Sequence, residues 1–313
     1  MKIPRYWKQV FKHVEDIKFD HILEYRLNND KADIYAWGYS DSSQEEALEN
    51  ANMRIDEIVK ALSSELDKNF YYPLNVLRED ILEEIEFEAD NRAIISRNRY
   101  HAQILNTENM MFVDIDIPTW DIKSASFFQR LFGKTKQVEE NNTQEIKKRY
   151  DNAIKKIEDY LLNDSEMGFR VYRTFAGLRL IATHTIYDPK SEETQQVFDA
   201  LGADPLYQKL CKAQDCFRAR LTPKFWRMDK ALGATPRIKY KVTKEMLHKW
   251  TKEDELRVKE YEEWIKQYES EHHSHATCHF ICHVGNPTIL TDIEPLIKLH
   301  DEITKSRSGK SLA

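Results

Sequence analysis

Residues 111–118 read Met-Phe-Val-Asp-Ile-Asp-Ile-Pro, an apolar run that contains two aspartates and ends at a proline. Side chains alternate between the two faces of a strand, so Asp114 and Asp116 are predicted to point the same way while the apolar residues face the core. Two neighbouring carboxylates repel each other unless a cation or a proton offsets their charge. Mg²⁺ and Mn²⁺ prefer oxygen ligands, so the pair predicts a divalent-metal site. The alternative is two solvated aspartates where a strand meets a proline turn.

Short periodic runs on both sides of this stretch predict the rest of the fold. Runs at 93–95, 100–105 and 110–117 are separated by polar residues and predict three consecutive antiparallel strands. The other predicted elements are strands at 34–39, 169–174, 178–183 and 277–283, helices at 44–66, 143–162, 192–200, 206–213, 244–270 and 293–305, and a short segment at 82–88. Together they predict an α/β protein of α+β type, with a mostly antiparallel central sheet flanked by helices.

Composition narrows the class of protein. A chain of 313 residues with 41% hydrophobic residues can bury a core in one large domain or two smaller ones. No apolar run approaches the roughly 20 residues that cross a bilayer. Residues 1–7 lack the apolar centre of a secretory signal, so we expect no membrane partner. Four cysteines are too few for a disulfide framework in a chain of this length, which favours reduced thiols and a cytoplasmic location.

Positive charge is concentrated in one segment of an acidic chain. Residues 204–241 contain ten Lys or Arg and three Asp, a local charge of +7. The whole chain carries −6, so the remainder carries −13. A basic segment in an acidic protein indicates a localised anion site, and the alternative is a solvated loop with basic side chains.

A hairpin at 169–183 and a turn at Asp204 supply further candidate residues. Gly177 is predicted to give the hairpin turn its conformational freedom, and Arg179 on the return strand suits bidentate contact with phosphate. The alternative is an edge hairpin with exposed arginines. Asp204 precedes a Pro and a predicted helix, so it suits both a helix cap and a metal ligand. Arg218 and Arg220 are two apart on a predicted strand and should share a face.

The order of these motifs resembles the catalytic domain of the archaeo-eukaryotic primase superfamily, the primase-polymerases. The resemblance covers roughly residues 93–227. In that superfamily the first motif supplies two metal-binding carboxylates, and the second contacts the phosphates of the incoming nucleotide. The third motif supplies another carboxylate, and basic residues downstream bind the nucleotide.

Carried over to this chain, the resemblance implies that Asp114, Asp116 and Asp204 are catalytic and bind Mg²⁺ or Mn²⁺. It implies nucleotide or phosphate contacts from the second motif and the basic residues downstream, namely Arg173, Thr174, Gly177, Arg179, Arg218, Arg220 and Lys224. Arg179 occupies the place where the superfamily usually has a histidine. That change keeps a phosphate donor and removes a titratable group.

The predicted function is metal-dependent nucleotidyl transfer of primase-polymerase type, with nucleoside triphosphates and nucleic acid as partners. One alternative is a metal-dependent phosphodiesterase or nuclease, which needs the same carboxylates and cations. The other is a catalytically inactive protein that binds nucleotide or nucleic acid through its arginines. The departure at Arg179 and the acidic overall charge favour the inactive protein, so whether the chain is an enzyme stays open.

Three regions complete the predicted organisation: an N-terminal strand–helix unit at 1–90, a primase-like core at 91–243, and a helix–strand–helix extension at 244–313. The segment from 118 to about 142 is interpreted as an excursion with an apolar group at 127–132, either a mobile flap or a short helix packed on the core. Seven His and Cys residues between 272 and 283 are of the type that binds zinc, but their spacing matches no finger pattern and favours a core strand preceded by a loop that bears histidines.

Overall fold

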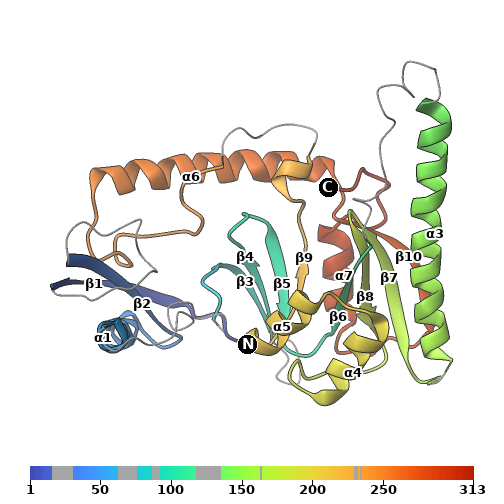
Figure 1. Ribbon diagram of the computed structural model, residues 1–313, viewed down its shortest axis with the longest axis horizontal. Coiled ribbons are helices and arrows are strands. Elements are labelled where there is room, and N and C mark those ends of the chain that lie inside the picture. Colours follow the sequence, from blue (N-terminus) through green and yellow to red (C-terminus); the bar gives the residue numbers. More distant parts are fainter. Residues whose placement is uncertain are drawn as a thin grey trace.

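Two antiparallel sheets of four strands each lie at the centre of the protein (Figure 1). The computed structural model describes residues 1–15, 31–62, 76–86, 92–117, 135–162, 164–228, 232 and 235–313. The first sheet has the strand order β10–β7–β8–β6 and the second β3–β4–β5–β9. Every ladder between described strands runs antiparallel. The predicted mixed class of helices with antiparallel sheets is confirmed.

The bounds of the elements are as follows. The first sheet consists of β6 (Phe112–Asp116), β7 (Gly168–Thr174), β8 (Gly177–Ala182) and β10 (Cys278–Gly285). The second consists of β3 (Asp80–Glu86), β4 (Arg92–Arg97), β5 (Gln103–Thr107) and β9 (Phe217–Arg220). A hairpin is formed by β1 (Tyr6–Glu15) and β2 (Lys31–Ser40). The helices are α1 (Gln44–Leu62), α3 (Thr135–Leu161), α4 (Glu192–Leu201), α5 (Pro205–Gln214), α6 (Lys252–Glu271) and α7 (Glu294–Ile303).

Helices α3 and α7 cover opposite faces of the first sheet. Tyr172 on β7 has its ring centroid 4.9 Å from that of His300 on α7. The next residue, Arg173, has its guanidinium carbon 4.8 Å from the ring centroid of Tyr150 on α3. Successive residues of a strand point to opposite faces, so both faces of this sheet are covered. In the part of the chain that the structure describes, no helix has the length and apolar character needed to cross a membrane.

The N-terminal hairpin and α1 have a small apolar core of their own. Their shared core consists of Val10, Ile34, Ala36, Ala51, Ile55 and Ile58. Helix α1 lies so close to β2 that a Cβ added at Gly38 would be 2.1 Å from the backbone nitrogen of Ala51. Strand β1 was not predicted, and the strand expected at 34–39 is the second strand of this hairpin.

The prediction of three consecutive strands at 93–117 is wrong for the third. Strands β4 and β5 pair as expected, but β6 leaves their sheet and pairs with β8. All six residues of β8 are buried, so this strand needs neighbours on both edges, and β6 and β7 supply them. Consecutive apolar runs predict strands well, whereas the partner of each strand depends on tertiary packing.

Two helix starts differ from the prediction. Helix α6 begins at Lys252 rather than near 244, because Thr251 and Asp254 form a reciprocal capping box. Helix α3 begins at Thr135, so the excursion predicted to reach about 142 ends earlier. Its apolar group at 127–132 lies outside the described residues, as do residues 63–66 of the first predicted helix.

Gly177 is required by a close approach between strands rather than by the turn conformation that its sequence context predicted. Its φ is not among the positive values found at Gly202, Gly285 and Gly309. A Cβ added at Gly177 would instead lie 2.0 Å from the carbonyl oxygen of Ile115 on β6. The pairing of β6 with β8, and therefore the position of Asp114 and Asp116, depends on this glycine.

We expect Gly177→Ala to lower the free energy of unfolding by about 3 kcal/mol, because the added methyl group pushes β8 away from β6. Gly309→Ala is the control: a Cβ there meets nothing within 4 Å, so only its left-handed φ of 69° costs stability, about 1 kcal/mol. Urea denaturation measures both variants. Equal losses in the two would show that the approach of β6 and β8 does not matter.

Candidate functional site

The buried guanidinium of Arg179 joins the two sheets at the centre of the site. Arg179 lies directly opposite Asp114 in the ladder of β8 and β6 and is 2% exposed. Its Nε donates to Asp114 Oδ1 at 2.8 Å and its Nη2 to Asp114 Oδ2 at 3.2 Å. Its Nη1 donates to the carbonyl oxygen of Arg220, at the end of β9, at 2.9 Å. Burial by itself lowers the pKa of Arg179, but the Asp114 carboxylate outweighs it and holds this pKa above its ordinary value.

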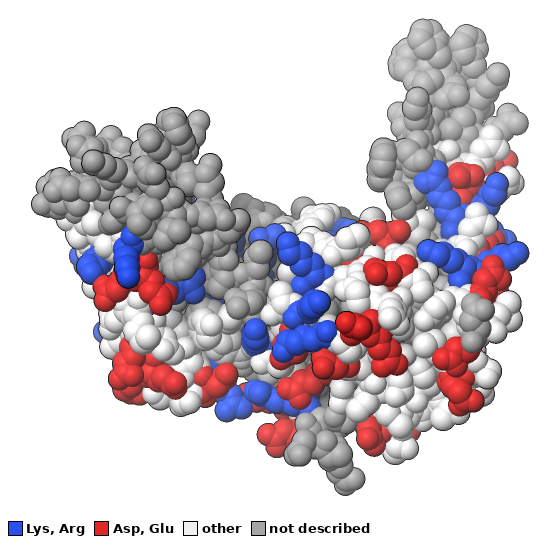
Figure 2. Space-filling model, turned by 60° about the horizontal axis from the view of Figure 1, so that its bottom comes forward, with Lys and Arg blue, Asp and Glu red and all other residues white. Residues whose placement is uncertain are grey.

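A cleft of about 930 Å³ lies beside this ion pair. Both sheets and the N-terminal hairpin contribute to its walls. The predicted site residues that line it are Asp114, Asp116, Thr174, Arg179, Asp204, Arg218, Arg220 and Lys224. On the face shown in Figure 2, Lys and Arg side chains gather near the middle and Asp and Glu side chains lie beside them. Charges of both signs therefore meet in one region of a chain whose net charge is only −6.

Asp204 fills the helix-cap role that its sequence position allowed, and its role as a metal ligand stays a prediction. Its Oδ1 accepts the backbone N–H of Leu206 at 2.7 Å, so it caps α5, with Pro205 as the first helical residue. Its own backbone N–H donates to the carbonyl oxygen of Asp114 at 2.9 Å. This bond holds the start of α5 against β6, and residues far apart in the sequence become neighbours.

Asp116 lies close to the carboxylates of two other aspartates, Asp204 and Asp114. Burial raises its pKa most, and the nearby carboxylates of Asp204 and Asp114 raise it further. Lys224 and Arg227 act in the opposite direction but leave this pKa above its ordinary value. A group that resists ionisation because of its neighbours gains most when a cation arrives.

Positive charge accumulates on the adjacent wall, where Arg220 and Lys224 are incompletely neutralised. Burial, together with Arg220 and Arg227, lowers the pKa of Lys224 to about 8. Burial, together with Arg179 and Arg227, lowers the pKa of Arg220 to about 10. The Nε of Arg220 is buried and has no acceptor within the described chain. An anion in the cleft would relieve this repulsion.

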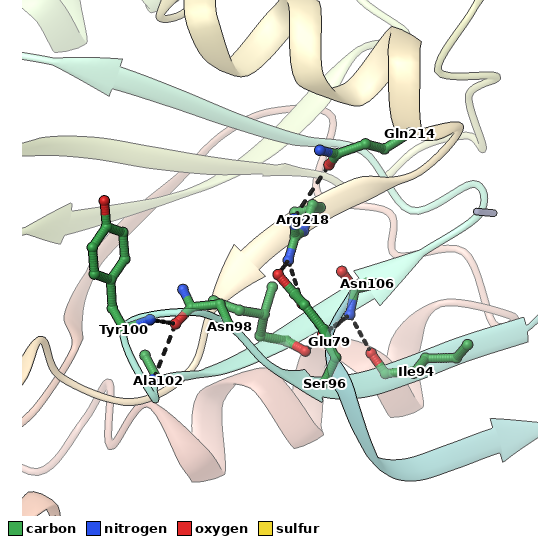
Figure 3. Close-up of polar contacts among 10 residues, drawn as sticks. Glu79, Ile94, Ser96, Asn98, Tyr100, Ala102, Asn106, Gln214 and Arg218 are labelled. Carbon is green, nitrogen blue, oxygen red and sulfur yellow. Dashed lines mark hydrogen bonds and ion pairs between the residues drawn. The ribbon is translucent and has the colours of Figure 1, made fainter. Parts of the chain in front are cut away.

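Arg218 and Arg220 both lie on the cleft-facing side of β9, as predicted. The Arg218 guanidinium, however, is already paired with side chains of this protein. Its Nη2 donates to both carboxylate oxygens of Glu79 at 2.7 Å, and its Nη1 donates to Gln214 at 3.2 Å (Figure 3). Glu79 also accepts from Ser96 on β4. The pair is largely buried and fixes the segment before β3, so Arg218 positions the wall of the cleft.

Arg173 was predicted to contact phosphate, but its side chain lies outside the cleft. Its exposed guanidinium lies over Tyr150 of α3, on the face of the first sheet opposite Arg179, and it does not line the cleft. Thr174, the next residue, does line the cleft at the end of β7. The phosphate contacts implied by the resemblance are therefore split between two faces of one strand.

Several cleft residues were not predicted from the sequence. Arg227 lies within the basic segment 204–241, and its proximity to Asp116 follows only from the turn after β9. Arg78 had no sequence signal: its guanidinium carbon lies 3.3 Å from the ring centroid of Trp37 and 5.5 Å from that of Tyr240. Those contacts join the N-terminal hairpin to the rest of the cleft wall.

The described residues contain no group of three or more His, Cys, Asp or Glu side chains arranged closely enough to hold a metal ion. The three aspartates are neighbours whose carboxylates would have to move to share an ion. Within the His and Cys stretch, residues 278–283 lie in strand β10, as favoured, with a register shift between Phe280 and Cys282 that breaks the expected alternation. His272 is buried and packs against Tyr268.

Comparison of the chain with protein-family models, curated proteins and solved structures finds no match. Any assignment of function therefore rests on the side chains that line the cleft.

We expect Arg179→Met to lower the free energy of unfolding by about 3 kcal/mol, because the Asp114 charge loses its partner and the link to β9 is lost. This value is at the low end for a broken buried pair, since 33% of the Asp114 side chain is exposed to solvent. Arg173→Met is the control, because Arg173 is exposed and should change stability by less than about 1 kcal/mol. A similar small loss in Arg179→Met by urea denaturation would contradict the assigned role.

Proposed function

We propose that the cleft binds a nucleoside triphosphate together with Mg²⁺ or Mn²⁺, and that the protein is a metal-dependent nucleotidyltransferase. One observation carries this proposal: opposite charges accumulate in neighbouring parts of the cleft and neutralise each other only in part. Burial and then two other carboxylates raise the pKa of Asp116, while burial and then two arginines lower the pKa of Lys224. A metal–triphosphate complex brings a cation and an anion together and would relieve both repulsions.

Asp116, Asp204 and Asp114 are the residues that would hold the metal. Their carboxylate oxygens are the ligands that Mg²⁺ and Mn²⁺ prefer. Asp116 is the exposed residue at the end of β6, whereas Asp204 Oδ1 and both oxygens of Asp114 already accept hydrogen bonds. A carboxylate oxygen has a second lone pair, so these bonds leave coordination open. The metal would supply charge neutralisation and activation of the attacking hydroxyl.

Lys224, Arg220 and Arg227 are the residues that would hold the phosphates. Lys224 and Arg220 line the cleft as partly exposed side chains, and the buried Nε of Arg220 lacks an acceptor among the described residues. Guanidinium groups bind phosphate oxygens in pairs, and a lysine adds a mobile point charge. Thr174 also lines the cleft and would contribute a hydroxyl.

The resemblance to the primase-polymerases supports transfer of the nucleotide to nucleic acid. Asp114 and Asp116 come from one motif and Asp204 from another, and all three line one cleft, as that resemblance implies. The four free cysteines of the chain agree with the cytoplasmic location that we propose for such an activity.

A second candidate, nucleotide binding without turnover, is favoured by one specific contact. Arg179 stands where the resemblance would have a histidine, and its guanidinium forks onto both oxygens of Asp114. A carboxylate engaged in this way binds a metal less readily than a free one. Extension of a labelled primer in the presence of Mn²⁺ separates the candidates, since only the transferase lengthens the primer.

We expect Asp116→Asn to weaken binding of a manganese–triphosphate complex at least tenfold, because the variant loses a charged ligand worth about 1.5–3 kcal/mol. Isothermal titration calorimetry measures the affinity. Asp159→Asn, an exposed substitution on α3 outside the cleft, should leave it unchanged. Equal affinity in both variants would exclude a metal ligand at Asp116.

We expect affinity for a magnesium–triphosphate complex to fall above pH 8. Lys224 has a pKa lowered to about 8, so it loses its proton in the free protein as the pH rises through that value. Bound phosphate favours the charged lysine, so binding above this pH requires proton uptake, and affinity falls by up to about tenfold per pH unit. In Lys224→Arg the cation stays protonated and the profile should be flat to about pH 9. A fall in Lys224→Arg as steep as in the natural chain would contradict this assignment.

A further inference from the structure

Three turns that are distant in the sequence converge beside the cleft, and each presents one aromatic ring. Tyr100 lies in the turn between β4 and β5, Phe175 in the turn between β7 and β8, and Trp226 in the short helix η3 (Phe225–Arg227) after β9. The rings of Tyr100 and Trp226 meet edge to face with centroids 5.4 Å apart. Arg227, which follows Trp226, has its guanidinium carbon 4.2 Å from the ring centroid of Phe175. The three turns therefore form one continuous strip.

The rings in this strip are exposed, unlike most aromatic side chains of the protein. Trp226 and Phe175 are each 50% exposed and Tyr100 is 37% exposed. Tyr35 is the one other aromatic residue with comparable exposure among the described residues, and it lines the same cleft. Exposed rings cost free energy in water unless something covers them. Their concentration at a single cleft indicates a binding surface.

Local structure holds these rings outward. Phe225 packs against Trp264 of α6 with ring centroids 5.3 Å apart, so the neighbouring Trp226 is directed to solvent. Asn98 accepts the backbone N–H groups of Tyr100 and Ala102 at 2.9 and 3.2 Å, which fixes the turn (Figure 3). The Tyr100 ring extends from that turn away from the strands.

Each of the three rings has a cation beside it. The guanidinium carbon of Arg99 lies 4.7 Å from the Tyr100 ring centroid, and the Nζ of Lys224 lies 5.5 Å from that of Trp226. Arg227 occupies the same position for Phe175. Exposed rings that alternate with cations match a chain of alternating bases and phosphates, since every base has a face to stack and every phosphate a charge to pair.

We propose that this strip, made of Tyr100, Phe175, Trp226, Arg99, Lys224 and Arg227, binds single-stranded nucleic acid, with bases stacked on the rings and phosphates held by the cations. A duplex presents paired and stacked bases that cannot reach rings on a rim, so single strands are the fitting form. Stacking on rings and contacts with phosphates do not distinguish one base from another, so we expect binding that does not depend on the base sequence.

This inference rests on the proposed function in one respect: the strand would deliver its end to the site where the nucleotide binds. Lys224 belongs to both sites, because it lines the cleft and contacts Trp226. Trp226 does not line the cleft and belongs to the strip alone. Substitution of Trp226 therefore tests the strip without removing any predicted nucleotide ligand.

The experiment is fluorescence anisotropy of the full chain, without metal, with labelled oligothymidylate and oligouridylate of about 12 nucleotides. Trp226→Ala should weaken binding about tenfold or more, the effect of losing one stacked base, and Trp226→Phe should restore most of it. Leu256→Ala is the matched control, because Leu256 has a similar exposure of 57% but lies on α6 outside the cleft. The plot of log affinity against log salt should have a slope of about −2, from three cations on a single strand.

The inference fails if a duplex of the same length binds as tightly as the single strands, or if Trp226→Ala binds them as the natural chain does. It also fails if polyglutamate of equal length competes as well as the oligonucleotides, since charge alone would then explain binding. A preference for either oligothymidylate or oligouridylate supports the strip. Affinity for the manganese–triphosphate complex is measured in parallel for the natural chain and for Trp226→Ala, and we expect it to be equal in the two. If the natural chain does not bind the triphosphate but binds the single strands, the proposed function is refuted and the strip stands.

Discussion

The rest of the site depends on the buried fork that Arg179 makes with Asp114. Asp114 is held on β6 of the first sheet, and the same guanidinium donates to the carbonyl oxygen of Arg220 at the end of β9 in the second. A buried guanidinium is tolerated only when its donors are satisfied, so the two sheets have one relative position that meets this demand. The cleft, its aspartates and its cations all follow from that position.

This arrangement leaves charge of both signs poorly neutralised at short range. Arg179 satisfies Asp114 but leaves Asp116 beside Asp204, and Glu79 satisfies Arg218 but leaves Arg220 beside Lys224. A protein that needed only stability would gain from pairing these groups directly. A site for a charged ligand requires charged side chains that are not already fully paired. The ion pairs of Arg179 and Arg218 provide a rigid frame around such side chains.

The sequence patterns predicted the helices and strands better than they predicted which strands and side chains pair with one another. The period-two run at 111–117 correctly placed two aspartates on one side of a strand, and the spacing of Arg218 and Arg220 correctly placed both at the cleft. Pairing of β6 with β8, the turning of Arg173 towards α3 and the pairing of Arg218 with Glu79 depend on contacts between distant segments. Periodicity and residue spacing in one sequence do not show which distant segments meet, so the role of Arg179 as a structural link was not predicted.

The most direct test of the central claim is a crystal structure with Mn²⁺ and a non-hydrolysable nucleoside triphosphate, measured at a wavelength where manganese scatters anomalously. We predict an anomalous peak on the carboxylate of Asp116, with the phosphates against Lys224 and Arg220. Manganese away from all three aspartates, or a triphosphate bound outside the cleft, would contradict the account.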